Sequence, residues 1–347
     1  MGHMGQKILV TGGTGYIGSH TTVELQQEGF EVISLDNLSN SELKVLDGIE
    51  EITGKSPIFY EMDCNDKEAL RAIFEEHGGI QGIIHFAASK AVGESVQKPL
   101  LYYRNNIVPM LNLLELMGEY GVAGIVFSSS CTVYGQPETL PVTESAPILP
   151  ATSPYGNTKQ INEEIIRDTI HAGADFRAIL LRYFNPIGAH PSAAIGELPR
   201  GVPQNLVPYL TQTAAGIRKE LSVFGDDYDT PDGSCIRDYI HVVDLAKAHV
   251  KAVRRMIRKE SDEPLEIFNV GTGKGVSVLE LIHTFEEATG VPVPHKIAAR
   301  REGDIEQVWA DPTRANEVLG WHAQSTLADT LRSAWMWQQK VCRESGK

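Results

Sequence analysis

A glycine-rich turn directly after a short apolar run constrains the fold of this 347-residue chain more than any other feature. Residues 7–11 (KILVT) have the pattern of a buried parallel strand, and an apolar-periodic helix follows the turn. Gly13, Gly15 and Gly18 satisfy G-x-G-x-x-G, and Gly12 with Gly15 and Gly18 satisfies G-x-x-G-x-x-G. Glycine allows the backbone to turn sharply and approach a pyrophosphate at the helix N-terminus. The stretch therefore predicts a dinucleotide-binding strand–helix–strand unit.

An acidic residue ends the second predicted strand. Residues 31–35 (EVISL) read as that strand, and Asp36 follows Gly18 by 18 residues. A carboxylate there accepts hydrogen bonds from ribose hydroxyls and repels a 2′-phosphate, which favours NAD over NADP. Without the glycine turn, a polar residue ending a strand would be the simpler interpretation.

Further strand and helix patterns alternate along the first half of the chain. We expect strands at residues 57–62, 80–85, 124–127 and 176–182, with helices at residues 66–77 and 100–120 between them. This alternation predicts an α/β fold with a doubly wound parallel sheet, whose ligands bind beyond the carboxyl ends of the strands. The side chains that follow the strands should therefore converge on one crevice.

These strand-end residues have candidate roles. Asp63 is placed to reach the adenine edge, and Phe86 and Ala87 are placed to line the cofactor. The serines at 128–130 could form only a polar loop, but one hydroxyl there could hold a reacting sugar hydroxyl. Ser130 is the preferred candidate and Thr132 the second.

Tyr155 and Lys159 form a candidate proton-transfer pair. Pro154 suits the first turn of a helix and Ser153 suits its N-cap, so Tyr155 and Lys159 lie four residues apart on one helix face. An adjacent ammonium stabilises a phenolate and lowers its pKa, which would allow the tyrosine to act as a base. Taken alone, the pair could equally be a packed ring beside a solvated charge.

The composition changes after Asn185, where residues 190–205 are rich in proline and glycine. We expect a smaller α/β substrate-binding lobe there. Arg237, in a polar loop, and Arg301, in a second loop beside Asp304, could clamp a diphosphate, although solvated surface charges are the simpler reading of either alone. Residues 239–255 read as a strand end followed by a helix, and residues 266–270 as another strand; both should return to the first lobe.

These patterns predict the following division of the chain. Residues 6–185, with returning segments near 239–270, form the Rossmann domain, residues 186–238 and 271–347 form the discontinuous second lobe, and residues 1–5 (MGHMG) are a tag remnant.

Bulk properties exclude several classes of protein. The net charge of −14 argues against nucleic-acid and anionic-membrane surfaces. The four cysteines are widely spaced, which indicates reduced thiols in a cytoplasmic protein, and no apolar run is long enough to span a bilayer. The 11 histidines form no HExxH or other ligand-spaced cluster, so no metal is expected.

The chain resembles the UDP-glucose 4-epimerase family of extended short-chain dehydrogenase/reductases over essentially its whole length after residue 5. The motifs that carry the resemblance are residues 12–20 (GGTGYIGSH), 85–97 (HFAASKAVGESVQ), 128–135 (SSSCTVYG), 182–191 (RYFNPIGAHP), 237–241 (RDYIH), 301–304 (REGD) and Tyr155 with Lys159. The resemblance implies tightly bound NAD, reversible 4-epimerisation of UDP-glucose and UDP-galactose through a 4-keto sugar, a role in galactose metabolism and a homodimer.

The resemblance also implies residue roles. Tyr155 as phenolate would take the proton of the sugar 4-hydroxyl, Lys159 would bind the nicotinamide ribose and lower the Tyr155 pKa, and Ser130 would bridge the hydroxyl. The implied NAD contacts are Gly12, Gly15, Tyr16, Ile17, Gly18, Asp36, Asn37, Asn40, Asp63, Phe86, Ala87, Lys90, Asn105, Tyr155, Lys159 and Phe184. The implied UDP-sugar contacts are Lys90, Ser130, Thr132, Tyr155, Asn185, Asn205, Leu206, Phe224, Arg237, Arg301, Asp304 and Val308.

Two positions depart from the family pattern. Cys131 stands where alanine is common, and Val308 stands where many bacterial members carry a tyrosine that walls the sugar pocket. We hypothesise that the smaller Val308 leaves space for an N-acetyl group, so that UDP-GlcNAc and UDP-GalNAc also become substrates.

Other functions are weighed against this one. A 4,6-dehydratase is disfavoured because Thr132 is followed by Val133 and Tyr134 rather than by the two carboxylates that elimination needs. A UDP-glucuronate 4-epimerase or decarboxylase stays open, as does a catalytically silent NAD-binding protein on the same fold. Product analysis separates the two uronate enzymes from a UDP-glucose 4-epimerase. A Tyr155→Phe variant tests the catalytically silent alternative.

Overall fold

The computed structural model describes residues 5–301 and 304–346. Most of the predicted tag remnant, and Glu302 and Gly303 of the REGD motif, lie outside the described residues.

A seven-stranded sheet in the order β11-β6-β5-β4-β1-β2-β3 forms the centre of the larger part of the molecule. Its strands are β1 (Lys7–Thr11), β2 (Glu31–Asp36), β3 (Ile58–Glu61), β4 (Ile80–His85), β5 (Gly124–Ser130), β6 (Arg177–Tyr183) and β11 (Leu265–Val270). Every neighbouring pair is parallel. The chain winds outward in one direction through β2 and β3 and in the other through β4, β5 and β6. The expected doubly wound parallel sheet is confirmed, and its switch point lies between β1 and β4.

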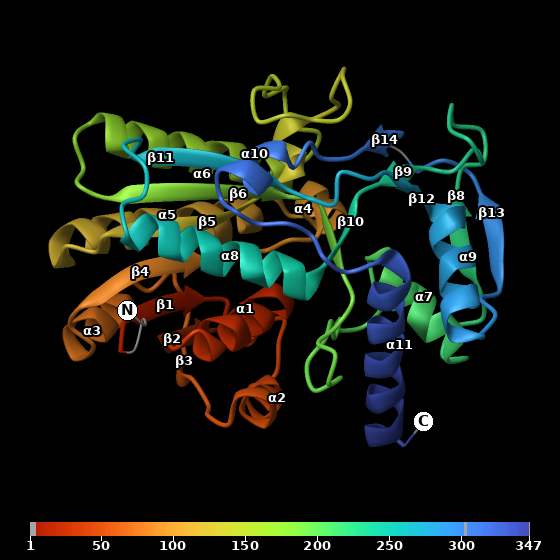
Figure 1. The fold of residues 1–347 in the computed structure, drawn as a ribbon, viewed down its shortest axis with the longest axis horizontal. Helices are drawn as coiled ribbons and strands as arrows, with labels where there is room; N and C mark the ends of the chain where they lie inside the picture. The colour runs from red at the N-terminus through yellow and green to blue at the C-terminus, as the bar shows by residue number, and fades with distance from the viewer. Residues whose placement is uncertain (1–4, 302–303, 347) are drawn as a thin grey trace.

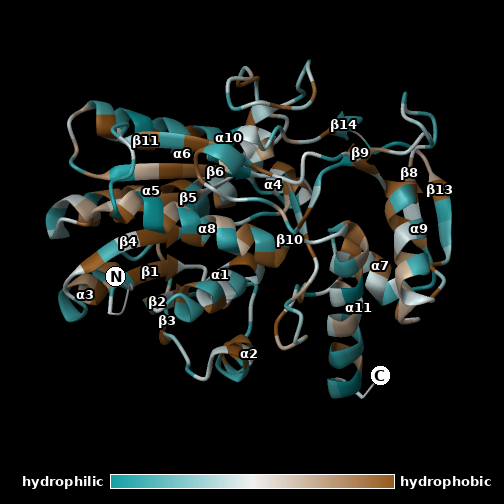
Figure 2. Cartoon of the chain, in the orientation of Figure 1, coloured by the Kyte–Doolittle hydropathy of each residue, from teal (hydrophilic) through white to brown (hydrophobic). Residues whose placement is uncertain are grey.

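Helices cover both faces of this sheet (Figure 1). On one face lie α1 (Tyr16–Gln27) and α8 (Val242–Ile257), and on the other lie α3 (Lys67–Glu76), α5 (Pro99–Tyr120) and α6 (Pro154–His171). Side chains alternate along a strand, so Ile8 and Val10 enter one core while Leu9 enters the other. Figure 2 shows the strands largely hydrophobic and the outer sides of the helices polar.

A second part of the molecule packs around its own core. It contains α7 (Leu206–Ala214), α9 (Val278–Thr289) and α11 (Leu327–Glu344). Its strand pairs are β8 (Leu221–Phe224) with β13 (His295–Ala298), and β9 (Ile236–Arg237) between β12 (Val276–Ser277) and β14 (Gln307–Val308). The parallel pair β7 (Asn185–Ile187) and β10 (Tyr239–His241) joins the two parts. The remaining elements are α2 (Lys44–Thr53), α4 (Val92–Gln97), the 3-10 helix η1 (Cys131–Tyr134) and α10 (Thr313–Glu317).

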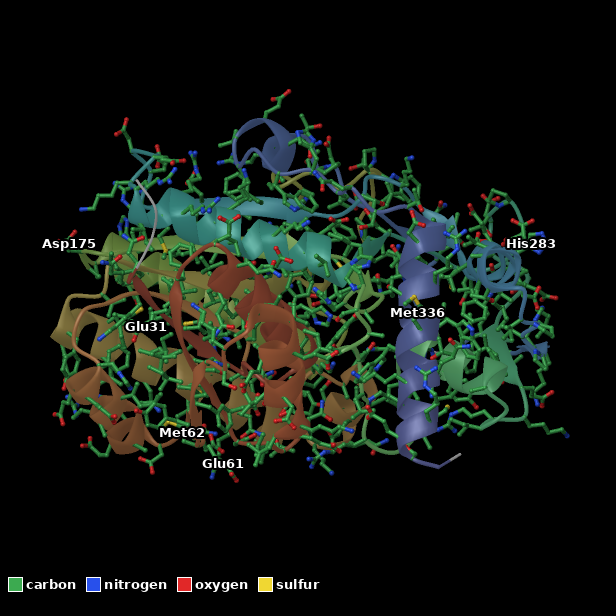
Figure 3. All side chains as sticks on the ribbon, turned by 60° about the horizontal axis from the view of Figure 1, so that its bottom comes forward. Glu31, Glu61, Met62, Asp175, His283 and Met336 are labelled. Carbon is green, nitrogen blue, oxygen red and sulfur yellow. The ribbon has the colours of Figure 1, made fainter. Side chains whose placement is uncertain are left out.

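The second part lies beyond the carboxyl edge of the sheet. Figure 3 shows Glu31 at the start of β2 and Asp175, just before β6, toward the end of the molecule opposite His283 of α9 and Met336 of α11. The carboxyl ends of the strands therefore point toward the second part, and a doubly wound sheet binds its ligands beyond these ends.

Two local predictions differ from the structure. The serines at 128–130 belong to β5 rather than following it, because β5 continues its pairing with β6 as far as Ser130 and Tyr183. Arg237 lies in β9 rather than in a loop, since β9 pairs with β12 and β14 on its two sides. The serines at 128–130 and Arg237 are therefore all held on hydrogen-bonded strands rather than on loops.

The segments expected to return to the larger part do lie with the sheet: β11 pairs with β6, and α8 packs against it. The exact division into domains stays a proposal. Among the described residues no helix is long and apolar enough to cross a membrane, and no group of three or more histidine, cysteine or acidic residues is arranged to hold a metal.

Candidate active site

Two glycines of the turn between β1 and α1, Gly12 and Gly18, have no room for side chains. Gly12 has a φ of 70°, and a Cβ on it would lie 2.8 Å from the backbone nitrogen of Ala87. A Cβ on Gly18 would lie 2.2 Å from the carbonyl oxygen of Gly12. The N-cap residue Gly15 offers no side-chain hydrogen bond, and the first turn of α1 carries no acidic residue. The turn thus leaves helix N–H groups for an anion and fits a dinucleotide pyrophosphate.

Predicted adenosine-binding residues lie at the ends of β2 and β3. The Oδ1 atom of Asp36 accepts hydrogen bonds from the Leu38 N–H at 2.9 Å and the Ser41 hydroxyl at 3.2 Å. Its Oδ2 has no partner among the described residues, so it can accept from a ribose hydroxyl. Asn37 donates to Asp63 at 3.2 Å, which brings these two predicted contacts together.

The other predicted NAD contacts lie along the same edge, with varied exposure. The Phe86 ring packs 4.7 Å from the ring of His249, and the Ala87 N–H donates to the Thr11 hydroxyl at 3.2 Å. Asn105 donates to the Ser89 hydroxyl at 3.2 Å. Phe184 is buried, whereas Asn40 and Lys90 are exposed.

Lys159 lies in a buried environment beside Tyr155 on α6. Ser153 caps this helix by accepting a hydrogen bond from the Gly156 N–H at 3.2 Å, and Pro154 occupies its first turn. The Lys159 Nζ atom donates to the Ser128 carbonyl at 2.7 Å and lies 5.8 Å from the centre of the Tyr155 ring. Burial lowers the pKa of Lys159 to about 8, although the Glu163 carboxylate acts in the opposite direction.

Tyr155 differs from the sequence-based expectation. Burial raises the pKa of its phenol above the ordinary value, and the neighbouring Tyr183 and Cys131 add to this effect, while hydrogen bonding to Ser130 opposes it. Sequence reasoning expected Lys159 to lower this pKa. In the protein alone, the loss of hydration is the largest cause of the shift, because a phenolate is costly in a buried site.

The end of β5 and the start of η1 supply hydroxyl groups next to this pair. The Ser130 hydroxyl accepts a hydrogen bond from the Thr132 N–H at 3.2 Å, and the hydroxyls of Ser128 and Tyr183 are 2.6 Å apart. The Thr132 Oγ1 atom is buried and has no hydrogen-bond partner in the described chain. An orphaned hydroxyl here suits a site that binds a polar ligand.

The second part brings four predicted substrate contacts together. Asp304 lies 2.8 Å from Arg301 and 3.9 Å from Arg237, and the Arg301 guanidinium lies 5.0 Å from the centre of the Phe224 ring. Because β14 pairs with β9, Val308 is the register partner of Arg237. It is buried in one apolar cluster with Phe184, a predicted cofactor contact.

The remaining predicted substrate contacts lie on β7 and at the start of α7. Asn185 belongs to β7 and donates its backbone N–H to Asp238, and Asn205 is the N-cap residue of α7. Leu206 begins α7 and packs on the core of the second part.

Sequence reasoning missed two acidic residues. Glu197 accepts a hydrogen bond from Asn205 at 2.7 Å and lies 3.6 Å from Lys90, so it connects two predicted ligand contacts from different parts of the molecule. Glu163 lies in a buried ion pair with Arg182. Its spacing of four residues from Lys159 could have revealed it, whereas the contacts of Glu197 depend on loop packing that the sequence pattern does not encode.

The family model described as "NAD dependent epimerase/dehydratase family" matches residues 8–271. The chain belongs to this family. It is also 53% identical over 331 residues to a protein of Bacillus subtilis named UDP-glucose 4-epimerase, with 95% of this chain and 96% of the relative covered. The resemblance expected from the motifs is thereby confirmed.

Two solved structures agree with the fold. A UDP-glucose 4-epimerase from Stenotrophomonas maltophila, with bound NAD and formylated UDP-arabinopyranose, has a TM-score of 0.94 at 48% identity, covering 98% of this chain and 99% of that one. A UDP-glucose 4-epimerase from Bifidobacterium longum, in complex with NAD+ and UDP, has a TM-score of 0.92 at 48% identity, covering 96% and 98%.

Proposed function

We propose that the protein is an NAD-dependent UDP-glucose 4-epimerase that interconverts UDP-glucose and UDP-galactose. The observation that carries this proposal is that Tyr155 and Lys159 on α6 lie at the same edge of the sheet as the glycine turn. The similarity to named UDP-glucose 4-epimerases over nearly the full chain supports the choice of reaction. The same similarity favours 4-epimerisation over the uronate and dehydratase alternatives.

NAD would be held mainly by backbone and carboxylate groups of the larger part. The glycine turn and the first N–H groups of α1 would bind its pyrophosphate, and Asp36 would accept from its adenosine ribose. Bound NAD supplies an acceptor and donor of hydride at the sugar C4, which allows a 4-keto sugar to form and to be reduced on its other face.

Tyr155 would act as the proton-transfer group for the sugar 4-hydroxyl, and Ser130 would hold that hydroxyl by a hydrogen bond. The phenolate form would need positive charge, because burial raises the pKa of Tyr155. Lys159 supplies an ammonium within 5.8 Å of the ring centre. We assign Lys159 this electrostatic role together with binding of a ribose hydroxyl.

The smaller part would hold the UDP group. Arg237 and Arg301 gather around Asp304, where their guanidinium groups could bind the two phosphates, and Phe224 lies beside Arg301. A keto sugar must turn over between its two reductions, so tight contacts to the sugar itself would slow the reaction. Contacts to the UDP group, which is remote from the reacting carbon, can supply the binding energy while the sugar stays free to turn.

Three further properties belong to the proposal. UDP-GlcNAc and UDP-GalNAc are second candidate substrates, because valine at 308 is smaller than tyrosine. A homodimer follows the family resemblance. A cytoplasmic location is supported by the four cysteines, none of which forms a disulfide.

Nucleotide-sugar chromatography of the purified protein tests the proposed function. We expect UDP-galactose to be converted to UDP-glucose without added NAD, because the cofactor stays bound. Conversion only after NAD is added would keep the reaction and reject tight binding. No conversion under either condition would reject the epimerase and favour a silent NAD-binding protein.

A further inference from the structure

Glu163 lies one helical turn beyond Lys159 on the same face of α6, and the mechanism above does not use it. Its side chain is 4% exposed, and that of its partner Arg182 on β6 is 2% exposed. One carboxylate oxygen accepts from the Arg182 Nε at 2.9 Å and from the Ser129 hydroxyl at 2.6 Å, and the other accepts from a terminal nitrogen of Arg182 at 2.5 Å. Such a bidentate pair has a fixed geometry.

This face of α6 meets three consecutive residues of β5. Lys159 donates to the Ser128 carbonyl at 2.7 Å, and Ser129 donates to Glu163 at 2.6 Å. The Ser130 side chain acts on the Tyr155 phenol and opposes the rise in its pKa. Glu163 therefore anchors the same strand end that presents Ser130 to Tyr155.

Arg182 extends this anchor to the other elements around the site. It donates to the Tyr134 hydroxyl at 3.0 Å, and Tyr134 donates to Asn269 of β11 at 2.6 Å. Tyr134 closes η1, the short helix that begins directly after Ser130. A single buried ion pair thus connects α6 with η1, β6 and β11.

The electrostatic surroundings of Lys159 give Glu163 a second role. The titratable groups that face Lys159 or its neighbour Tyr155 are His85 on β4, Tyr102 on α5, Cys131 in η1, Arg182 and Tyr183 on β6, and Tyr155 and Glu163 on α6. Burial lowers the pKa of His85 to about 3 and raises that of Tyr183 to about 12, so both are neutral near pH 7. Glu163 is the anionic member of this set.

We propose that Glu163 is a positioning residue for the reaction: held by Arg182, it fixes the catalytic face of α6 against the end of β5 and keeps Lys159 charged. The catalytic consequence rests on the proposed function. The effect on Lys159 does not, because it depends only on the chain itself.

The titration of Lys159 provides a test that needs no turnover. Lysines labelled with ¹³C at the ε carbon are followed by NMR across pH in the protein as purified, and the Lys159 signal is identified by its loss in Lys159→Met. Removing the carboxylate in Glu163→Gln should lower the titration midpoint by about one pH unit. Glu163→Asp, which keeps the charge, should restore most of that shift.

Glu163→Gln also leaves the Arg182 cation buried without its partner, which can prevent folding. The double variant Glu163→Gln/Arg182→Met removes both charges. If Glu163→Gln does not fold, the proposal is tested with this double variant. Its midpoint should also fall, because Glu163, and not Arg182, is the charged group of this pair that acts on the pKa of Lys159. The matched control is Glu266→Gln, which breaks the buried pair of Glu266 with Arg255 (2.8 and 2.9 Å) on β11 and α8.

The outcomes separate a positioning role from a merely structural one. A midpoint that falls in Glu163→Gln and in the double variant, and stays in place in Glu266→Gln, supports the proposal, and with it the pH above which turnover declines should move down by a similar amount. An unchanged Lys159 midpoint in the double variant overturns the proposal. A shifted midpoint in a protein whose parent shows no epimerase activity would instead reject the proposed function and leave the role of Glu163 on Lys159 standing.

Discussion

At the scale of single residues, the site combines groups whose buried environments oppose their charged forms. Burial raises the pKa of Tyr155 and lowers that of Lys159 to about 8. The first shift disfavours the phenolate form of Tyr155 and the second disfavours the ammonium form of Lys159. The proposed chemistry uses both of these charged forms. The proposed chemistry therefore needs compensating charge: the Glu163 carboxylate would favour the ammonium form of Lys159, and the positive ring of bound NAD would favour the phenolate form of Tyr155.

A Tyr155→Phe variant should lose turnover while it keeps its cofactor. Removing the phenol deletes the proton-transfer group, for which we expect a fall in kcat of about 10²–10⁴-fold. Turnover is measured by chromatography of UDP-sugars, and bound NAD by its release on denaturation. Tyr60→Phe is the matched control, because Tyr60 lies on β3 and its hydroxyl hydrogen-bonds His77 at 2.6 Å rather than a residue of α6 or β5. Turnover near the parent level in Tyr155→Phe would contradict the assignment.

A Val308→Tyr variant should discriminate against N-acetylated substrates. Val308 is 4% exposed and shares an apolar cluster with Phe184, so a tyrosine there must occupy space beside the predicted nicotinamide and sugar contacts. We expect turnover of UDP-GlcNAc to fall at least about tenfold relative to that of UDP-galactose, because the N-acetyl group loses its space. Val308→Ala should retain both activities. An unchanged ratio in Val308→Tyr, with a folded protein by thermal melting, would reject the pocket hypothesis.

At the scale of elements, the sequence predicts most of what positions the site. The strand before the glycine turn, the helix after it, and the N-cap of α6 follow from apolar runs, glycine spacing and the Ser153–Pro154 pair. The end of β5 was predicted too early, because three serines look like a loop until β6 is available to pair with them. Where a strand ends can depend on how far the neighbouring strand pairs with it. The sequence of the strand itself does not contain this information.

A Gly12→Ala variant should lose bound NAD. The added methyl group would lie 2.8 Å from the Ala87 backbone nitrogen, and Gly12 has a φ of 70°. Gly121→Ala is the matched control, because Gly121 has a φ of 64° but no heavy atom within 4 Å of its Cβ position. Both variants should lose about 1 kcal/mol from backbone strain. Only Gly12→Ala should release NAD, measured as nicotinamide absorbance per chain after denaturation, and equal NAD content in the two variants would contradict a cofactor role for the turn.

At the scale of the whole molecule, sequence patterns predict the sheet but not how the second part meets it. Glu197 contacts Lys90 and Asn205 from a proline- and glycine-rich segment with no periodicity, so nothing local encodes its position. Arg182 is similar, because an arginine within an apolar strand looks like an edge residue until Glu163 is found opposite it. Long-range polar contacts of this kind depend on tertiary packing rather than on local pattern.

Three buried histidines on different elements should make the whole fold sensitive to acid. Burial lowers the pKa of His20 on α1 and His85 on β4 to about 3, and that of His249 on α8 to about 4. In the unfolded chain they titrate near pH 6.5, as ordinary histidines do. Between these values the unfolded state binds more protons than the folded state, so folding stability is fully present above pH 6.5 and is lost as pH falls toward 4. Each histidine contributes a slope of up to about 1.4 kcal/mol per pH unit.

Urea unfolding at several pH values between 7.5 and 4.5 measures this slope, and a histidine variant isolates it from the carboxylates that also titrate there. His249 is the best position, because its Nε2 has no hydrogen-bond partner among the described residues and its Nδ1 meets only the Leu245 carbonyl at 2.9 Å. We expect His249→Gln to reduce the pH dependence of the free energy of unfolding by up to about 1.4 kcal/mol per pH unit. His283→Gln, at an exposed position on α9 (Figure 3), is the matched control for the substitution itself. Equal slopes in His249→Gln and the parent would contradict this prediction, because they would show that His249 takes up its proton at the same pH in the folded and unfolded states.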